Sequence, residues 1–473
     1  MSKPNVVFIF TDDQRFDTIS ALGNSEIDTP NLDRLVASGT SFTHAHIMGG
    51  TAGAVCMPSR AMMLTGRTLF SLENQGQRIP PEHTMMPEWF RQHGYATAHV
   101  GKWHQDRKSH SRAFSTGAKI FGFRKKQGWY EACNGHWHIP VHDYDSEGTY
   151  PPDGGYSDPP IEPFQAPFEP VKENGKHSAE VFSDAAIDFI KSHPASEAGK
   201  AGNPFFLYLA HIAPHDPRQY PPHLRDRYSA DKVALPESFA IKHPFDNGEM
   251  LVRDELLECF PRRPETVKQH IADYFAIINH VDEQVRRVLD AIEDSGQADN
   301  TVVIFAADNG LAVGRHGLMG KQNVYDHSVR VPLIFAGPGI PKDQKTDTLC
   351  YLLDIFPTLC ELTELPIPET VEGKSLLPAV RDPNAQIRET LHFAYKGVQR
   401  AVRKGHHKLI EYVVNGNRNT QLFDLANDPN EARNLAEDPC STEILNELGT
   451  ELRRWQSDLG DTQEMGQEFW EDF

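Results

Sequence analysis

The sequence predicts an α/β protein with a large, mostly parallel central sheet flanked by helices, followed by a smaller C-terminal α+β subdomain. Short apolar runs rich in β-branched and aromatic residues recur along the chain, as expected for buried parallel strands. Amphipathic, helix-like stretches separate these runs, which is the alternation that a parallel sheet requires. At 473 residues, the chain is also long enough to bury a large core.

The strands and helices are predicted from these runs in chain order. The clearest strand candidates are VVFIF (6–10), ATAHV (96–100), FFLYLA (205–210), TVVIFAA (301–307) and VPLIFAG (331–337). A helix is predicted over 29–39, where Leu32, Leu35 and Val36 share one face. A second helix is predicted over 272–296, with Gly296 as its stop signal.

The pattern changes near residue 385. Before it, a segment rich in Pro, Gly, Asp and Tyr (140–175) interrupts the alternation and is predicted to leave the sheet. After it come the short strand-like pieces ETLHFAY, KLIEYVV and TQLFDLA and an acidic, helical end. We therefore predict a main unit over 1–384 and a C-terminal subdomain, a small antiparallel sheet plus helix, over 385–473.

Composition excludes several classes of partner. The chain has 66 acidic and 47 basic residues and a net charge of −19, which argues against nucleic acids and anionic membranes. No apolar run approaches the roughly 18 residues that span a bilayer. The first apolar run has five residues, shorter than the about 7–15 of a signal peptide, so the sequence predicts a cytoplasmic protein, or a periplasmic or secreted one if a signal was removed. Six scattered cysteines predict mostly free thiols rather than a disulfide framework.

Polar residues follow four of the predicted strands directly. They are Asp12 and Asp13 after 6–10, Lys102 and His104 after 96–100, His211 and His215 after 205–210, and Asp308 and Asn309 after 301–307. Ligands of open α/β sheets bind outside the carboxyl ends of the strands. These side chains are therefore predicted to converge on one edge of the sheet. Lys321 follows a glycine-rich stretch and precedes another strand, so it is a further candidate for this edge.

Two carboxylates at 12–13 and an Asp-Asn pair at 308–309 form an oxygen-only donor set. Taken singly, the Asp12-Asp13 pair is better explained as a helix cap, and the Asp308-Asn309 pair as a plain turn. Taken together, they favour a site for a hard cation such as calcium or magnesium.

Cys56 opens the stretch CMPSRAMMLTG. Pro58 suits the first turn of a helix, whose N-terminal N–H groups and dipole favour an anion. Arg60 adds a guanidinium that matches a tetrahedral oxyanion. The alternative is a buried structural cysteine, which would need none of these neighbours.

This stretch resembles the signature of the type I sulfatases, in the alkaline phosphatase superfamily, in which the cysteine is oxidised to formylglycine. TDDQR, GKWH, APH (213–215), DNG, GKQNVYDHSVRVP and LFDLANDPNEARNLA add to the resemblance in chain order. It covers nearly the whole chain and is weakest from about 105 to 175. It implies an alkaline-phosphatase-like fold and a sulfuric ester hydrolase matured by a formylglycine-generating enzyme.

The resemblance also implies roles for individual residues. Those that would hold one divalent cation, calcium before magnesium or manganese, are Asp12, Asp13, Asp308, Asn309 and the modified Cys56. Arg60, Lys102 and Lys321 would neutralise the transferring sulfuryl group, with Cys56 as nucleophile. His215 would protonate the leaving group, and His104 would assist release of sulfate.

The substrate is predicted more weakly. Histidines, tryptophans and the basic run Arg124–Lys126 gather between residues 103 and 145, which suits a sulfated saccharide; the alternative is packing and solvation of this stretch. A phosphonate monoesterase or phosphodiesterase, a sulfatase of small choline-like esters and a non-catalytic binder of sulfated glycans are the rival functions. The oligomeric state stays open.

Overall fold

The computed structural model describes residues 3–122, 136–137, 141, 143–147, 175–461 and 464–471. Part of the stretch predicted to bind a saccharide therefore lies outside the described residues, including the run Arg124–Lys126, Trp129, His138 and His142. Most of the segment 140–175, predicted to leave the sheet, also lies outside them.

An eight-stranded sheet forms the centre of the protein, in the order β11-β2-β10-β8-β1-β7-β5-β6. Its strands are β1 (Asn5–Thr11), β2 (Gly39–Phe42), β5 (Ala96–Lys102), β6 (Thr116–Phe121), β7 (Phe205–Ala210), β8 (Thr301–Ala307), β10 (Leu333–Ala336) and β11 (Gln344–Thr346). The five strands from β8 to β6 run parallel, whereas β10 pairs antiparallel with both of its neighbours. The predicted mostly parallel sheet is thus confirmed, and 331–337 supplies its antiparallel strand.

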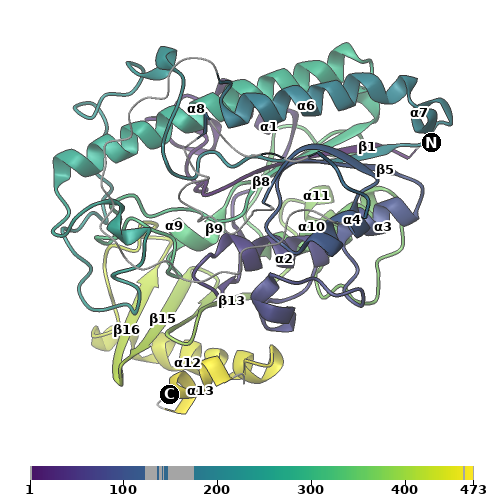
Figure 1. Ribbon diagram of the computed structural model, residues 1–473. Coiled ribbons are helices and arrows are strands. Elements are labelled where there is room, and N and C mark those ends of the chain that lie inside the picture. Colours follow the sequence, from purple (N-terminus) through teal and green to yellow (C-terminus); the bar gives the residue numbers. More distant parts are fainter. Residues whose placement is uncertain are drawn as a thin grey trace.

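Helices cover both faces of this sheet (Figure 1). The side chains of Val7 and Ile9 pack with the helices on one face, and Phe8 and Phe10 pack on the other, because successive strand residues point to opposite faces. The first layer contains α1 (Pro30–Ser38), α6 (Ser178–Ser192) and α8 (Pro264–Asp294). The second contains α2 (Cys56–Thr65), α3 (Met86–Gln92), α4 (Arg107–Ala113), α10 (Ile355–Leu362) and α11 (Leu377–Arg381).

The helices predicted near 29–39 and 272–296 are confirmed as α1 and the C-terminal part of α8. Leu32, Leu35 and Val36 are buried on α1, and Gly296 follows α8 with a φ of +69°. Two short helices are α7 (Glu197–Lys200) and α9 (Asp326–Val329). Within the described ranges, no helix combines the length and the apolar character that a membrane span needs.

A second sheet, in the order β16-β15-β14-β13-β4, lies at the C-terminal end of the molecule (Figure 1). Its elements and the helices beside it are β4 (Gly49–Gly50), β13 (Thr390–Tyr395), β14 (Gln399–Lys404), β15 (His407–Val414), β16 (Asn417–Asp424), α12 (Thr442–Asp458) and α13 (Glu464–Glu471). A small third sheet joins β3 (Ala45–His46), β9 (Arg330–Val331) and β12 (Cys350–Tyr351).

Two features of the second sheet differ from a simple C-terminal unit. Strand β14, QRAVRK, has no counterpart among the predicted strands because its charged residues hide the apolar pattern, although Arg400 and Arg403 are buried. Strand β4 comes from the segment just before α2 and pairs parallel with β13. The boundary between 384 and 385 therefore stays a prediction, while the sheet itself takes one strand from the main unit.

Candidate active site

The carboxyl ends of β8, β1, β7 and β5 lie next to one another in the central sheet. The segments that follow them bring the predicted site residues together with α2 and the segment around Lys321. The predicted site residues that come together are Asp12, Asp13, Cys56, Arg60, Lys102, His104, His215, Asp308, Asn309 and Lys321. Nine of these ten residues are buried, and His104 is partly buried. Their contacts with one another form one connected network, so the predicted convergence is present for these ten residues. His211, also predicted at this edge, lies instead beside Phe182 and among the buried histidines His136 and His280.

Oxygen atoms of four residues gather directly beyond β1 and β8. Asp13 has a φ of +63°, a conformation that Asp tolerates better than most residues, and its N–H donates to Asp308 Oδ1 at 3.1 Å. Asn309 Nδ2 donates to Asp13 Oδ1 at 2.7 Å. Asp12 Oδ1 and Asn309 Oδ1 are buried and accept no hydrogen bond from the part of the chain that the structure describes. Burying an oxygen without a hydrogen-bond donor costs free energy, so these two oxygens are suited to bind a cation or a donor from a ligand.

The residues present fit a hard divalent cation. Ligand atoms of Asp12, Cys56 and Asp308 lie within 4.8 Å of one another, and so do those of Asp12, Asp13 and His215. Carboxylate and amide oxygens dominate the set, and these are the ligands that calcium and magnesium prefer.

Three cations balance the three carboxylates of this site. Lys102 pairs with Asp12, and Lys321 Nζ lies 2.5 Å from Asp13 Oδ1. Arg60 Nε donates to Asp308 Oδ2 at 2.9 Å, and its Nη2 lies 2.8 Å from the same oxygen. Because the charges cancel among themselves, a divalent cation and an anionic ester can enter together without leaving a large excess of buried charge.

Cys56 occupies the first turn of α2, as the position of Pro58 predicts. Its Sγ lies 3.4 Å from His104 Nδ1 and 3.7 Å from Lys102 Nζ. The helix is anchored at the site because Ser59 Oγ donates to the Asp308 carbonyl at 2.5 Å. It ends at Gly66, where φ is +66° and an added Cβ would approach Val371 to 2.9 Å.

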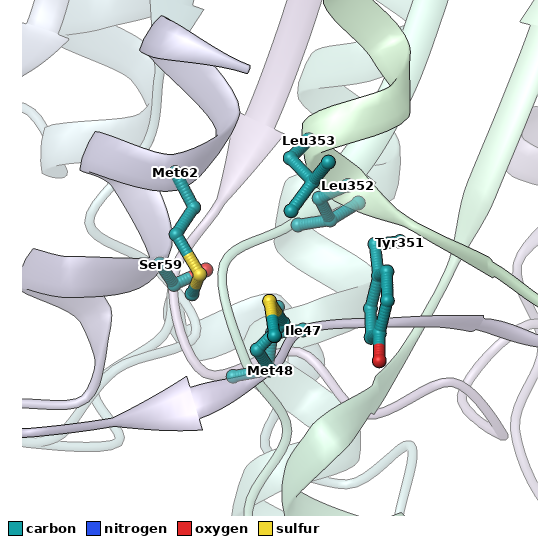
Figure 2. Close-up of a pocket in the computed structure, with 7 residues that line it drawn as sticks. All are labelled: Ile47, Met48, Ser59, Met62, Tyr351, Leu352 and Leu353. Carbon is teal, nitrogen blue, oxygen red and sulfur yellow. The ribbon is translucent and has the colours of Figure 1, made fainter. Parts of the chain in front are cut away.

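One side of α2 borders an apolar packing gap, to which its residues Ser59 and Met62 contribute (Figure 2). The gap lies between α2, the segment around Met48 and the 3-10 helix η8 (Leu352–Asp354). Its lining residues are Ile47, Met48, Ser59, Met62, Tyr351, Leu352 and Leu353, and none of them carries a charge. This region therefore fixes the helix in place and offers no group for acid–base chemistry.

Burial and neighbouring charge shift the pKa values of the site in opposite directions. Burial alone would raise the pKa of Asp12, but Lys102, His215 and Arg60 outweigh it and hold that pKa well below its ordinary value. Burial and the charge of Asp12 raise the pKa of Asp308 to about 6. Burial also raises the pKa of Cys56 to about 11, so an unmodified Cys56 is a neutral thiol at neutral pH. A thiol without thiolate character is a weak nucleophile.

His215 is oriented by the backbone around it. Its Nδ1 lies 2.8 Å from the Asp216 carbonyl, and its Nε2 lies 3.8 Å from Asp13 Oδ2. Its own carbonyl accepts from His136 Nε2 at 2.9 Å. With Nδ1–H donating to a carbonyl, Nε2 is the nitrogen that faces the carboxylates.

Two tyrosines that support the site are absent from the sequence prediction. Tyr208 Oη on β7 accepts from Arg60 Nη1 at 3.3 Å. Tyr274 Oη on α8 donates to the Asp13 carbonyl at 2.5 Å and accepts from the N–H of Arg15 at 2.9 Å. Both lie within apolar runs that predict core packing; the only available signal is that a buried phenol needs a hydrogen-bond partner.

A mixed sheet that collects carboxylates, cations, histidines and a helix-borne cysteine at the carboxyl ends of its strands defines an ester hydrolase of the alkaline-phosphatase-like class. The Sulfatase family model matches residues 4–365, and a model described as N-sulphoglucosamine sulphohydrolase, C-terminal, matches 314–458. The chain therefore belongs to the sulfatase family and is a sulfatase.

Relatives and solved structures support this assignment. An arylsulfatase of Clostridium perfringens is 28% identical over 92% of this chain and 90% of its own length. An N-acetylglucosamine-6-O-sulfatase of Bacteroides thetaiotaomicron is 25% identical over 92% of this chain and 82% of its own length. The solved phosphonate monoester hydrolase of Agrobacterium radiobacter has the same fold, with a TM-score of 0.73 at 21% identity over 97% of this chain and 96% of that one.

Proposed function

We propose that this sulfatase releases inorganic sulfate from a sulfated carbohydrate, with Cys56 converted to formylglycine and a calcium ion held beside it. The observation that carries the proposal is the position of Cys56. Its Sγ lies at the start of α2 between His104 and Lys102, within 4.8 Å of ligand atoms of Asp12 and Asp308. A structural cysteine would not require a cation, a histidine and two carboxylates around it.

Calcium would be held by Asp12, Asp13, Asp308, Asn309 and the modified Cys56. When bound, it would supply positive charge that polarises the sulfate ester and favours ionisation of the nearby hydroxyl nucleophile. The two buried oxygens without a donor, Asp12 Oδ1 and Asn309 Oδ1, support this placement.

Formylglycine would supply a hydrated aldehyde, whose one hydroxyl attacks sulfur and whose other allows sulfate to leave. The change from thiol to aldehyde is a two-electron oxidation with loss of sulfur, for which a formylglycine-generating enzyme would supply the oxidant. The neutral thiol of unmodified Cys56, with its pKa raised by burial, agrees with the need for this change.

The other side chains of the site bind charge and move protons. Arg60, Lys102 and Lys321 are fixed by ion pairs, so they can stabilise charge on the sulfuryl oxygens without reorganising. Protonated His215 would donate from Nε2 to the departing alkoxide, while Nδ1–H stays bound to the Asp216 carbonyl. His104, next to Cys56, would take the proton of the second hydroxyl as sulfate is expelled.

A carbohydrate is favoured as the leaving group for two reasons. One relative named above acts on N-acetylglucosamine 6-O-sulfate according to its name. In addition, the family model that matches residues 314–458 is named after N-sulphoglucosamine sulphohydrolase, an enzyme whose name specifies a sulfated sugar.

The first experiment compares sulfate and phosphate release from matched esters of one aryl leaving group. The protein is co-expressed with a formylglycine-generating enzyme and supplied with calcium, and Cys56→Ala is the control. We expect dominant sulfate release that is lost in the variant. Mass spectrometry of the Cys56 peptide reports whether maturation took place.

Dominant phosphate release from fully matured protein would overturn the proposal in favour of the phosphonate monoesterase or phosphodiesterase alternative. Binding of sulfated sugars without turnover, again by matured protein, would instead favour a non-catalytic glycan binder.

A further inference from the structure

Arg218 carries buried hydrogen-bond donors without an acceptor. It lies three residues after His215, in the segment that follows β7, and the residue as a whole is partly buried. Nε and Nη2 of Arg218 are buried and have no hydrogen-bond partner within the described parts of the chain. A buried guanidinium normally pairs with a carboxylate, because an uncompensated buried charge is costly.

The two carboxylates that act most strongly on the charge of Arg218, Asp216 and Asp273, are already engaged. Asp216 accepts from both terminal nitrogens of Arg253, Nη1 at 3.0 Å and Nη2 still closer. Asp273 Oδ1 accepts from Tyr220 Oη at 2.7 Å and from Gln269 Nε2 at 3.0 Å. Arg218 therefore lies close to acidic groups without an ion pair of its own among the described residues.

A hydrogen-bonded chain holds Arg218 in one orientation. Its Nη1 donates to His270 Nδ1 at 2.7 Å, and His270 Nε2 lies 3.3 Å from Glu258 Oε2. Since Glu258 accepts the proton on Nε2, Nδ1 of His270 is left as an acceptor for Arg218. The guanidinium is thus fixed on its Nη1 side, and its Nε and Nη2 edge stays available.

This edge belongs to the surroundings of the reaction site. The guanidinium carbon of Arg218 lies 6.0 Å from the centroid of the Tyr274 ring, and Tyr274 Oη donates to the Asp13 carbonyl at 2.5 Å. The carboxylates of Asp216 and Asp13 are both close enough to act on the charge of Arg218. The Arg218 guanidinium therefore lies in the segment that carries His215, beside the tyrosine that supports Asp13.

We infer that Arg218 binds a second anionic group, a carboxylate or a sulfate, on the sugar whose sulfate ester is hydrolysed. Nε and Nη2 form the planar fork that pairs with two oxygens of such a group. The inference rests on the proposed function and names its substrate class: a sulfated saccharide with at least two negative charges. Arg218 is then a specificity-determining residue, and His270 is the residue that positions it.

The test uses matured holoenzyme with calcium and follows hydrolysis of 4-nitrophenyl sulfate. Two matched pairs of sugars compete with this substrate. The first pair is glucosamine 2-N,6-O-disulfate and N-acetylglucosamine 6-O-sulfate, which differ in whether the nitrogen carries a charged sulfate or a neutral acetyl group. The second pair is a sulfated uronic acid and its methyl ester, which differ by a carboxylate. The pair with the larger ratio of inhibition constants identifies the anion.

We expect the doubly charged sugar of at least one pair to bind about 10- to 100-fold more tightly than its partner, the usual worth of charge-assisted hydrogen bonds. In Arg218→Gln this ratio should fall towards one, and Arg218→Lys should keep part of it. Arg225→Gln is the matched control, because Arg225 is an exposed arginine seven residues further along, and it should keep the full ratio.

Three results would overturn the inference: no preference for the second anion in the wild-type protein, an unchanged ratio in Arg218→Gln, or an equal loss in Arg225→Gln. If the matured protein releases no sulfate at all, the proposed function fails instead. In that case, the thermal shifts caused by the same sugars still report whether Arg218 discriminates between them, and a shift independent of Arg218 would overturn the inference too.

Discussion

Two buried clusters of carboxylates and cations in this protein resemble each other in composition. They differ in whether every carboxylate oxygen has a partner in the folded chain. The reaction cluster contains Asp12, Asp13 and Asp308 at the ends of β1 and β8. The second, which we call the C-terminal clamp, contains Asp326 on α9, Lys408 on β15 and Glu431 after β16. Lys408 Nζ lies 2.7 Å from Asp326 Oδ1 and 2.8 Å from Glu431 Oε1, and the N–H of Asp326 donates to Glu431 Oε2 at 2.7 Å.

The difference lies in whether each carboxylate oxygen has a cation or an N–H donor beside it. Glu431 Oε1 and Asp12 Oδ1 both lack a hydrogen bond among the described residues, but Glu431 Oε1 has the Lys408 ammonium 2.8 Å away. Both carboxylate oxygens of Asp326 face cations, with Arg403 Nη1 3.5 Å from Oδ2. In the reaction cluster, Asp12 Oδ1 lacks a hydrogen bond even though Lys102 pairs with Oδ2 of the same carboxylate. The clamp is complete without a ligand and joins the second sheet to the segment that carries Lys321. The reaction cluster is incomplete, as expected of a site that must accept an ion and a substrate.

Asp12→Asn should have the largest effect, because it removes charge from the incomplete cluster while keeping its shape. We expect activity to fall by at least about 10²-fold, comparable to the loss of a principal electrostatic group. Calcium at 100 times its dissociation constant should stabilise the wild-type protein by about 2.7 kcal/mol and so raise its melting temperature, and it should do so much less in the variant. An activity assay measures the first effect, and calorimetry with calcium and with a chelator measures the second. An unchanged calcium-dependent shift of the melting temperature in the variant would contradict the cation site.

Lys408→Met in the C-terminal clamp should have the opposite effects to Asp12→Asn: the fold should lose stability, while calcium binding and activity should be largely retained. Leaving Asp326 and Glu431 without their shared cation should cost about 3–5 kcal/mol of stability, measured by denaturant unfolding. The calcium shift should persist, and kcat of the folded variant should stay within about tenfold of wild type. Lys404→Met is the matched control: Lys404 pairs with Glu447 at the surface of the same sheet, and its loss should change stability little. Equal destabilisation by both variants would refute the clamp.

A smaller effect is expected from His211, which lies among other buried histidines. Burial, His280 and His136 lower the pKa of His211 to about 3, and both ring nitrogens of His211 lack a hydrogen-bond partner among the described residues. The imidazole of His211 therefore binds a proton below about pH 6.5 in the unfolded chain, but only below about pH 3 in the folded chain. This contribution to stability is present above pH 6.5 and is lost as the pH falls.

His211→Phe should reduce that loss, because it fills the same space without a proton site. The melting temperature of wild type and variant, followed from pH 8 to pH 4, should diverge on the acid side only. The remaining histidines near His211 are His136, His177 and His280, so the variant should retain part of the acid sensitivity. Parallel curves would show that His211 does not contribute. His223→Gln, at an exposed position, serves as the control.

The fold and most of the reaction site are predictable from the sequence because their signals are local. Strand β1 and the Asp12–Asp13 pair are contiguous, as are β8 and the Asp308–Asn309 pair, so a β run directly followed by polar residues reveals both. The motif that starts at Cys56 is likewise one uninterrupted helix. Strand β14 is missed since buried arginines interrupt its apolar pattern, and their burial depends on partners such as Asp461, 61 positions away from Arg400.

Residue type and order along the chain are enough to identify the parallel sheet, the helix that presents Cys56 and the carboxylates that end two strands. Which of these groups remain without a partner is decided only when distant segments meet. Lys321 neutralises Asp13 across 308 positions, and Tyr274 supports the same aspartate across 261. The unmatched oxygen of Asp12 and the unmatched guanidinium edge of Arg218 follow from such long-range contacts. The physical reason is that hydrogen bonding saturates: a donor or acceptor is free for a ligand only when every neighbour in the folded chain has found another partner.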